Sequence, residues 1–138
     1  MRSRQDTKVD AIAHVPLFEA ASKSDLKKIA SITDEIDIRE GKDLTREGAP
    51  GHEFFVLVEG TADVRRNGRK VRALGPGDFF GEIALVSRKP RTATVTATSP
   101  ILALVITEQS FRRLLEEQPT IGVKVLRSLA ERVIGDSL

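Results

Sequence analysis

Residues 80–95 of this chain read Phe-Gly-Glu-Ile-Ala-Leu-Val-Ser-Arg-Lys-Pro-Arg-Thr-Ala-Thr-Val. The end of this stretch alternates, which places Ala93, Val95 and Ala97 on one face of an expected strand and threonines on the other. Arg91 is in phase with the apolar residues and is therefore expected to point toward the apolar side. Because an unpaired buried charge is very costly, its guanidinium needs either a carboxylate of the protein or an anion from outside.

The beginning of the stretch predicts a site for such an anion. Gly81 precedes an expected short helix over residues 82–86, and the first N–H groups of a helix lack internal partners. A helix start reached through glycine can hold a phosphate, and an arginine fork fits two phosphate oxygens. Glu82 could accept a hydrogen bond from a sugar hydroxyl, as an acidic residue does in dinucleotide sites. The alternative is structural: Glu82 complements the helix dipole or pairs with Arg91 in an internal salt bridge, and Gly81 serves a turn.

The whole string resembles the phosphate-binding cassette of the cyclic-nucleotide-binding domain family, of the type found in the catabolite activator protein and in kinase regulatory subunits. The shared pattern is Phe-Gly-Glu, an aliphatic residue, Ala-Leu, a variable spacer, and then Pro-Arg, a small or hydroxyl residue, Ala, Thr and Val. The resemblance extends over about residues 9–133 and includes an N-terminal turn, two strand-end glycines and the approach to the cassette, at residues 15–18, 47–48, 59–60 and 75–78.

This resemblance implies a set of ligand-binding residues. Arg91 would hold the cyclic phosphate, Glu82 would bind the ribose 2′-hydroxyl, and Thr92 would donate to the phosphate or to a purine edge. Backbone groups would line the phosphate at Gly81, Ile83 and Ala84.

The resemblance also implies the ligand. By analogy with family members that bind cAMP, we expect cAMP. The alternative is cGMP, because a hydroxyl residue at the Thr92 position occurs in family members of either preference. Base selectivity usually needs a further contact from the last helix, where Leu126, Arg127 and Leu129 are candidates. The ordinary interpretation of these three residues, as core and solvated surface, is the one we favour.

The rest of the chain predicts the fold class. Residues 1–7 are expected to be a disordered tail or a remnant of cloning, followed by a short helical turn over residues 8–13 and a helix capped by Ser24. Strands are expected around residues 36–38, 53–59, 61–66, 69–74, 91–98 and 101–106, with Asn67-Gly68 as a type I′ hairpin turn. Helices follow over residues 108–118 and from Pro119 onward. We expect one α+β domain over residues 1–138, in which a β-barrel or jelly roll of about eight strands is flanked by an N-terminal helical segment and two C-terminal helices.

Composition excludes several other functions. Lys and Arg number 22 against 20 Asp and Glu, so the net charge of +2 does not favour a polyanionic partner, and the basic hairpin tip around residues 65–72 is expected to be solvated. The absence of cysteine excludes disulfides and thiolate catalysis, and two histidines are too few for a cupin-like metal site. No nucleophile–base pair is visible, so we expect no catalytic residue and no enzyme activity. The longest apolar run, Ile101 to Ile106, is too short to span a bilayer, and with no secretion signal we expect a cytoplasmic protein.

The final helix is expected to transmit the binding event. Ile121, Val125, Leu129 and Val133 recur every four residues and form an apolar stripe. We expect the nucleotide to favour a closed position of this helix. No helix-turn-helix fits before Leu138, so no DNA-binding region is expected in this chain. An effector domain, attached or separate, and a homodimer stay open, as does a rival in which a degenerate barrel serves only as an interaction scaffold.

Overall fold

The computed structural model describes the backbone of residues 3–85, 87 and 89–137, and their side chains except at 4, 82, 83 and 132–137. The chain divides into two compact units, one formed by Asp34–Glu108 and the other by the segments before and after it. The first contains β1 (Asp34–Ile38), β2 (Asp43–Thr45), β3 (Glu53–Glu59), β4 (Ala62–Arg66), β5 (Arg69–Leu74), β6 (Phe79–Phe80), η2 (Glu82–Leu85), β7 (Thr94–Ala97) and β8 (Ile101–Thr107). The second contains α1 (Arg4–Ala13), η1 (Pro16–Phe18), α2 (Lys23–Ser31), α3 (Glu108–Glu117, whose first residue belongs to the strand unit) and α4 (Pro119–Ser137).

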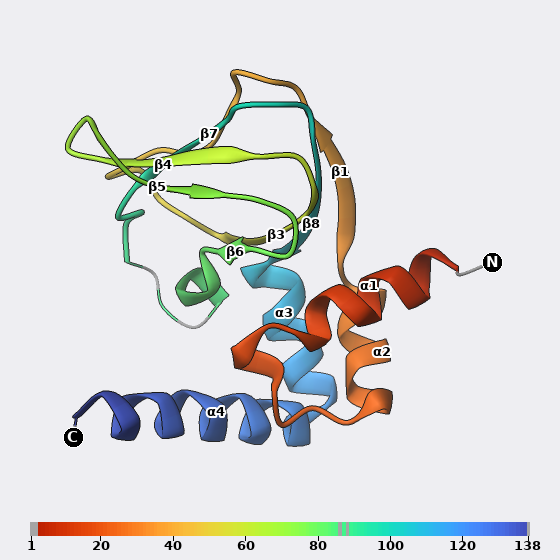
Figure 1. The fold of residues 1–138 in the computed structure, drawn as a ribbon. Coiled ribbons are helices and arrows are strands. Elements are labelled where there is room, and N and C mark those ends of the chain that lie inside the picture. The colour runs from red at the N-terminus through yellow and green to blue at the C-terminus, as the bar shows by residue number, and fades with distance from the viewer. Residues whose placement is uncertain (1–2, 86, 88, 138) are drawn as a thin grey trace. The chain divides into compact units, whose positions relative to one another are not determined.

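The strand unit consists of two four-stranded antiparallel sheets, with strand orders β1-β8-β3-β6 and β2-β7-β4-β5 (Figure 1). Both sheets contribute to one apolar core, to which β3 supplies Leu57, β4 supplies Val64 and β7 supplies Val95. Two sheets that bury their inner faces against each other form a jelly roll, so the predicted α+β class and strand number are confirmed.

Two strand predictions are met in detail. The apolar run of β3 is buried from Phe54 to Leu57, as expected for a strand covered on both faces. The hairpin between β4 and β5 turns through Asn67 and Gly68, whose φ angles of 54° and 77° are those of a type I′ turn. The turn thus sets the pairing next to it, Arg66 with Arg69 and Arg65 with Lys70, and the register shifts between Arg65 and Val64.

One strand begins later than the alternation predicts. β7 starts at Thr94, three residues after the predicted start at Arg91. The Arg91 N–H donates to the carbonyl of Ala49 at 2.9 Å, and the Arg91 carbonyl accepts from the Gly48 N–H at 2.8 Å. Arg91 thus pairs with a loop instead of a strand, although Ala93 and Val95 keep the predicted inward phase.

The N-terminal helix corrects the expectation of a disordered tail over residues 1–7. α1 begins at Arg4, because Ser3 and Asp6 form a reciprocal capping box: the Asp6 N–H donates to Ser3 Oγ at 3.1 Å, and the Ser3 N–H donates to Asp6 Oδ2 at 3.4 Å. Residues 3–7 are therefore ordered in a capped helix. Residues 1–2 lie outside the described part of the chain.

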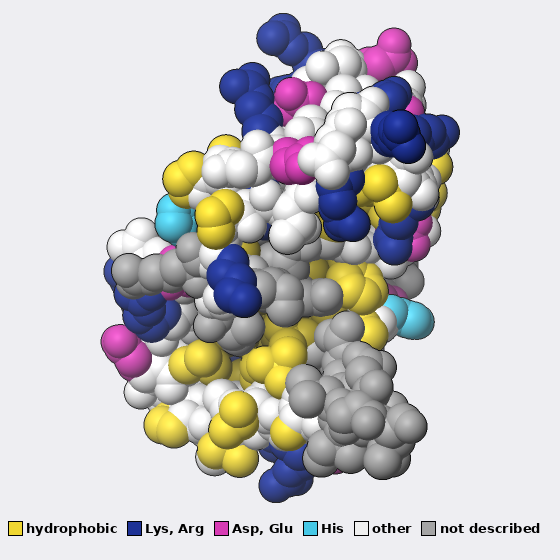
Figure 2. Space-filling model, turned by 90° about the vertical axis from the view of Figure 1, so that its left-hand side faces the viewer, with side chains coloured by type: hydrophobic (Ala, Val, Ile, Leu, Met, Phe, Trp, Pro, Cys, Tyr) yellow, Lys and Arg dark blue, Asp and Glu magenta, His cyan; other side chains and the backbone are white. Residues whose placement is uncertain are grey.

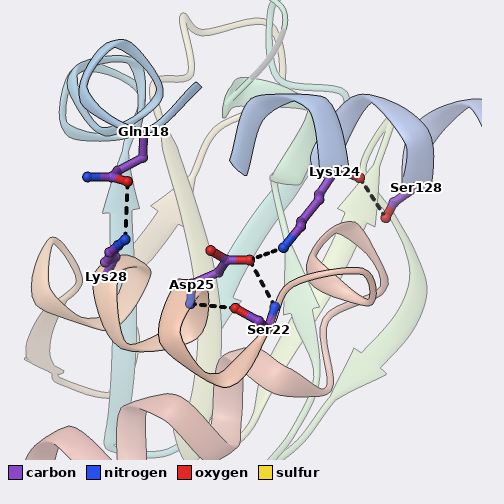
Figure 3. A network of polar contacts seen from close by, with 6 residues as sticks. All are labelled: Ser22, Asp25, Lys28, Gln118, Lys124 and Ser128. Carbon is purple, nitrogen blue, oxygen red and sulfur yellow. Dashed lines mark hydrogen bonds and ion pairs between the residues drawn. The ribbon is translucent and has the colours of Figure 1, made fainter. Parts of the chain in front are cut away.

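The second helix is capped by Ser22, and the prediction of Ser24 was wrong. Ser22 Oγ accepts from the Asp25 N–H at 3.1 Å and the Ser22 N–H donates to Asp25 Oδ2 at 2.9 Å, a pairing that Ser24 has no acidic partner to make. Lys124 of α4 donates to the same carboxylate oxygen at 2.6 Å, and Lys28 of α2 donates to Gln118 at 3.1 Å (Figure 3). Polar contacts thus join α2 to the start of α4.

The two C-terminal helices match their predicted ranges closely. In α4, Ile121 and Val125 are buried and Leu129 is partly buried, as the apolar stripe predicts, whereas the side chain of Val133 lies outside the described residues. Leu126 is 67% exposed. No helix in the described part of the chain is both long and apolar enough to cross a membrane.

Candidate functional site

A cavity of about 380 Å³ opens within the strand unit, which is the size range of small-molecule sites. Its walls are mainly apolar and come from both sheets and from the segment between β6 and β7. The lining includes Val64, Leu74, Phe79, Phe80, Ala84, Ala93 and Val95, together with Gly81, Arg91 and Thr92. The structure therefore brings Gly81, Ala84, Arg91 and Thr92 to one cavity, four of the six residues predicted from the sequence.

The Arg91 side chain lies in a slot that two glycines leave open. A Cβ atom on Gly81 would lie 2.5 Å from Arg91 Nη1, and a Cβ atom on Gly51 would overlap Nε of the same side chain. Gly81 also has a φ of +82°, which side chains rarely adopt. Within this slot Nη2 donates to the carbonyl oxygen of Glu53 at 2.6 Å. The guanidinium is thus oriented by backbone atoms.

The charge of Arg91 has no ionic partner in the described structure. Among the side chains that can be described, no carboxylate forms an ion pair with it, and its hydrogen bond goes to a neutral carbonyl. Burial lowers the pKa of Arg91, and the Glu53 carboxylate opposes this shift. The predicted alternative of an internal salt bridge concerns the side chain of Glu82, which lies outside the described residues.

The predicted phosphate cradle is a single tight turn. The expected helix over residues 82–86 is the 3₁₀ helix η2, Glu82–Leu85, and Val86 lies outside the described residues. The Ala84 N–H donates to the Gly81 carbonyl at 3.0 Å, so it would have to be shared or released to reach a phosphate. The side chain of Ile83 lies outside the described part, and its backbone role stays a prediction.

Three cations of the cavity lining were missed in the sequence. Arg66, Arg72 and Lys89 line the cavity together with Arg91, and none of the described lining residues is acidic. Arg72 lies opposite Val64 in the hairpin register, so both are on the same face of the sheet. Alternation from the buried Val64 places Arg66 on the inner face, whereas Arg72 comes to lie opposite Val64 through a register shift between Val64 and Arg65 that the two-residue turn does not predict. Figure 2 shows Lys and Arg side chains on the upper part of the face turned toward the viewer.

Two further sets of predicted residues are not among the described residues that line the cavity. Leu126, Arg127 and Leu129 lie on α4, and the first two are exposed. Neither histidine is among the residues that line the cavity, and His52 Nδ1 lies 3.4 Å from Glu108 Oε2. Among the described residues, no group of three or more His, Cys, Asp or Glu could hold a metal ion.

Comparison with known proteins points to one family. The model for the cyclic nucleotide-binding domain matches residues 35–118. A cAMP-dependent protein kinase regulatory subunit from Colletotrichum orbiculare is 34% identical over 115 residues, which is 82% of this chain and 29% of that protein. This chain therefore spans less than a third of the length of that curated relative.

Solved structures share the fold over most of the chain. The N-terminal domain of a transcriptional regulator from Streptomyces coelicolor A3(2) superposes with a TM-score of 0.85 at 28% identity, covering 92% of this chain and 94% of that one. A structure of cAMP-bound PfPKA-R superposes with a TM-score of 0.70 at 27% identity, covering 92% of this chain and 48% of that one.

Proposed function

This chain belongs to the cyclic nucleotide-binding domain family, and we propose that it is a non-catalytic sensor that binds cAMP in the cavity beside Arg91. The observation that carries the proposal is the state of Arg91. Its guanidinium is partly buried, is held by a carbonyl oxygen at 2.6 Å, and has no ionic partner among the described side chains. A phosphodiester brings the single negative charge that this site lacks.

In this proposal each residue of the cassette has a separate task. Arg91 neutralises the cyclic phosphate, and the exposed hydroxyl of Thr92 donates to the phosphate or to the purine edge. Glu82 accepts from the ribose 2′-hydroxyl, and backbone groups of Gly81, Ile83 and Ala84 line the phosphate. The regulatory subunit and the cAMP-bound structure among the similar proteins support cAMP as the ligand.

A second candidate ligand is cGMP, and one observation favours it. Arg72 lines the cavity, and an arginine side chain only donates hydrogen bonds. Guanine presents two acceptors, N7 and O6, along one edge, where adenine presents an acceptor and a donor. A base placed against Arg72 would therefore favour guanine.

The binding event is proposed to act through α4, which would pass it to an attached or separate effector. The nucleotide favours one position of the helix, and the coupling can be no larger than the difference in its affinity for the two positions. Hydrogen exchange across residues 119–133 tests this step. Ligand should increase protection there, and equal protection with and without ligand contradicts it.

Calorimetric titration of the purified chain with cAMP and cGMP tests the proposed function directly. Linear 5′-AMP is the control, because it has the same base and sugar without the cyclic phosphodiester. We expect saturable binding of a cyclic nucleotide and much weaker binding of 5′-AMP. Absence of binding by both cyclic nucleotides would assign the domain to the interaction-scaffold class.

A further inference from the structure

The hairpin of β4 and β5 carries two sets of charges on opposite faces. On the outer face, Asp63 pairs with Arg65 at 3.4 Å and with Lys70 at 3.3 Å. On the inner face, Arg66 and Arg72 line the cavity, and neither forms an ion pair with a side chain that the structure describes. The outer cations therefore share a carboxylate partner, whereas the inner ones have none among the side chains that the structure describes.

A backbone contact joins Arg66 to the residue that follows Arg91 in the chain. Its Nε donates to the carbonyl oxygen of Thr92 at 3.0 Å, and Thr92 directly follows Arg91. This hydrogen bond uses Nε. The two Nη groups of the guanidinium stay available, because no hydrogen-bond partner for them is found among the described residues. Arg66 is thus fixed in the same way as Arg91, by a neutral carbonyl that orients the cation without neutralising it.

The chemistry of a cyclic phosphodiester offers an acceptor for each cation. Its single negative charge is shared by two exocyclic oxygens, which project in different directions from the ring. Arg91 has already committed Nη2 to the Glu53 carbonyl, which limits the donors it can present to both oxygens. A second guanidinium beside it can bind the oxygen that Arg91 does not reach.

We propose that Arg66 is a second cation of the phosphate site, which binds one exocyclic oxygen through its Nη groups while Nε stays on the Thr92 carbonyl. This inference rests on the proposed function, because it places the phosphate at Arg91. It assigns an anion-binding role to a residue of the hairpin, outside the stretch 80–95.

Arg65 provides a matched control, because it is the neighbouring arginine of the same strand and points to the outer face. Titration of the full chain with cAMP should show that R66Q weakens binding roughly 5- to 20-fold, the range for a partly exposed hydrogen bond to a charged group. R65Q should change affinity by less than about twofold, as surface ion pairs contribute little. Equal effects of R66Q and R65Q overturn the proposal.

The two phosphorothioate diastereomers of cAMP separate a direct contact from a structural role at Thr92. Each replaces one exocyclic oxygen with sulfur. For each diastereomer we compare its affinity with that of cAMP and call the loss its affinity penalty. If Arg66 binds one oxygen, R66Q should reduce this penalty for one diastereomer and leave it unchanged for the other. If Arg66 only positions Thr92, both penalties stay as in the wild type, and the proposal is wrong.

A separate probe keeps this inference distinct from the proposed function. If the wild type binds no cyclic nucleotide, the proposed function fails, but the paired cation site can still be examined with inorganic phosphate. The Nε–Hε resonances of Arg66 and Arg91 should then shift together with one dissociation constant. Any titration in which the Arg66 resonance does not shift overturns the inference.

Discussion

Lys124 in the helical unit and Arg91 in the strand unit are both partly buried cations, but their partners differ in kind. Lys124 Nζ lies 2.6 Å from Asp25 Oδ2, and that oxygen also accepts from the Ser22 N–H (Figure 3). Arg91 Nη2 lies at the same distance, 2.6 Å, from an uncharged oxygen, the carbonyl of Glu53. Lys124 is neutralised by a carboxylate, whereas the described part of the chain gives Arg91 a neutral acceptor and no ion pair.

The pKa shifts express the same difference. The hydrogen bond from Lys124, followed by the one from the Ser22 N–H, lowers the pKa of Asp25, which is the mark of a carboxylate stabilised by its neighbours. Burial lowers the pKa of Arg91, and the charge of the Glu53 carboxylate opposes this shift only in part. The Lys124 pair therefore contributes to folding, whereas we propose that Arg91 is preorganised for an anion from outside.

The variant Arg91→Ala is expected to have the largest effect, a loss of affinity for cAMP. Removing the cation that we propose neutralises the cyclic phosphate should weaken cAMP binding by about 2–5 kcal/mol, or roughly 30- to 5,000-fold. Calorimetry is the measurement, and Arg46→Ala is the control, because Arg46 is an exposed cation 3.5 Å from Asp43. Unchanged affinity in Arg91→Ala contradicts the assignment.

The next effect concerns the slot that orients Arg91. Gly51→Ala should displace the guanidinium, because the new Cβ would overlap Arg91 Nε, and should lower stability by about 1–3 kcal/mol, as overpacking does. Binding of cAMP should weaken as well, by about tenfold. Gly75→Ala is the control, because a Cβ there meets nothing within 4 Å. Equal affinities of the two variants would show that the slot does not set the position of Arg91.

A smaller effect is expected from breaking the neutralised pair. Lys124→Met leaves the Asp25 carboxylate, whose side chain is 9% exposed, without its cation and should lower the free energy of unfolding by about 1–2 kcal/mol. Lys28→Met removes a hydrogen bond to the neutral Gln118 and should cost less. Urea unfolding measures both variants. A smaller loss for Lys124→Met than for Lys28→Met would remove the distinction between the two cations.

The smallest effect is the acid dependence of the same pair. Because folding lowers the pKa of Asp25 below its usual 3.8, its contribution is fully present above that pH and is lost as the pH falls through the lower folded value. Stability of the wild type should therefore fall more steeply below pH 3.8 than that of Asp25→Asn. If the free energy of unfolding, measured with urea, falls equally with pH in both proteins, the pair does not stabilise the Asp25 carboxylate.

Much of the fold follows from local sequence signals. The Asn67-Gly68 turn, the buried run of β3 and the two C-terminal helices depend on neighbouring residues, and the structure has them where the sequence predicts them. The helix starts at Ser3 and Ser22 were missed although their signal is also local, because an aspartate in the third helical position was not weighed as the partner of the cap. These errors concern the choice of cap and not the fold.

The site was less accessible from the sequence. The spacing of residues 80–95 identified Gly81, Ala84, Arg91 and Thr92, which line one cavity. The approach of Gly51 to Arg91 and the contact of Arg66 with Thr92 join residues 40 and 26 positions apart, 91 − 51 and 92 − 66, and no local pattern around Gly51 or Arg66 indicates these contacts. Such contacts depend on how the two sheets close around the cavity, which local patterns do not specify.

Unfolding of the wild type and Arg91→Gln, each with and without saturating cAMP, tests the central claim most directly. Without nucleotide the two proteins should differ by less than about 1.5 kcal/mol, because Arg91→Gln removes one hydrogen bond to a neutral oxygen and no ion pair with a side chain that the structure describes. With cAMP the wild type alone should be strongly stabilised. The account is contradicted if Arg91→Gln is severely destabilised without nucleotide, or if cAMP stabilises both proteins equally.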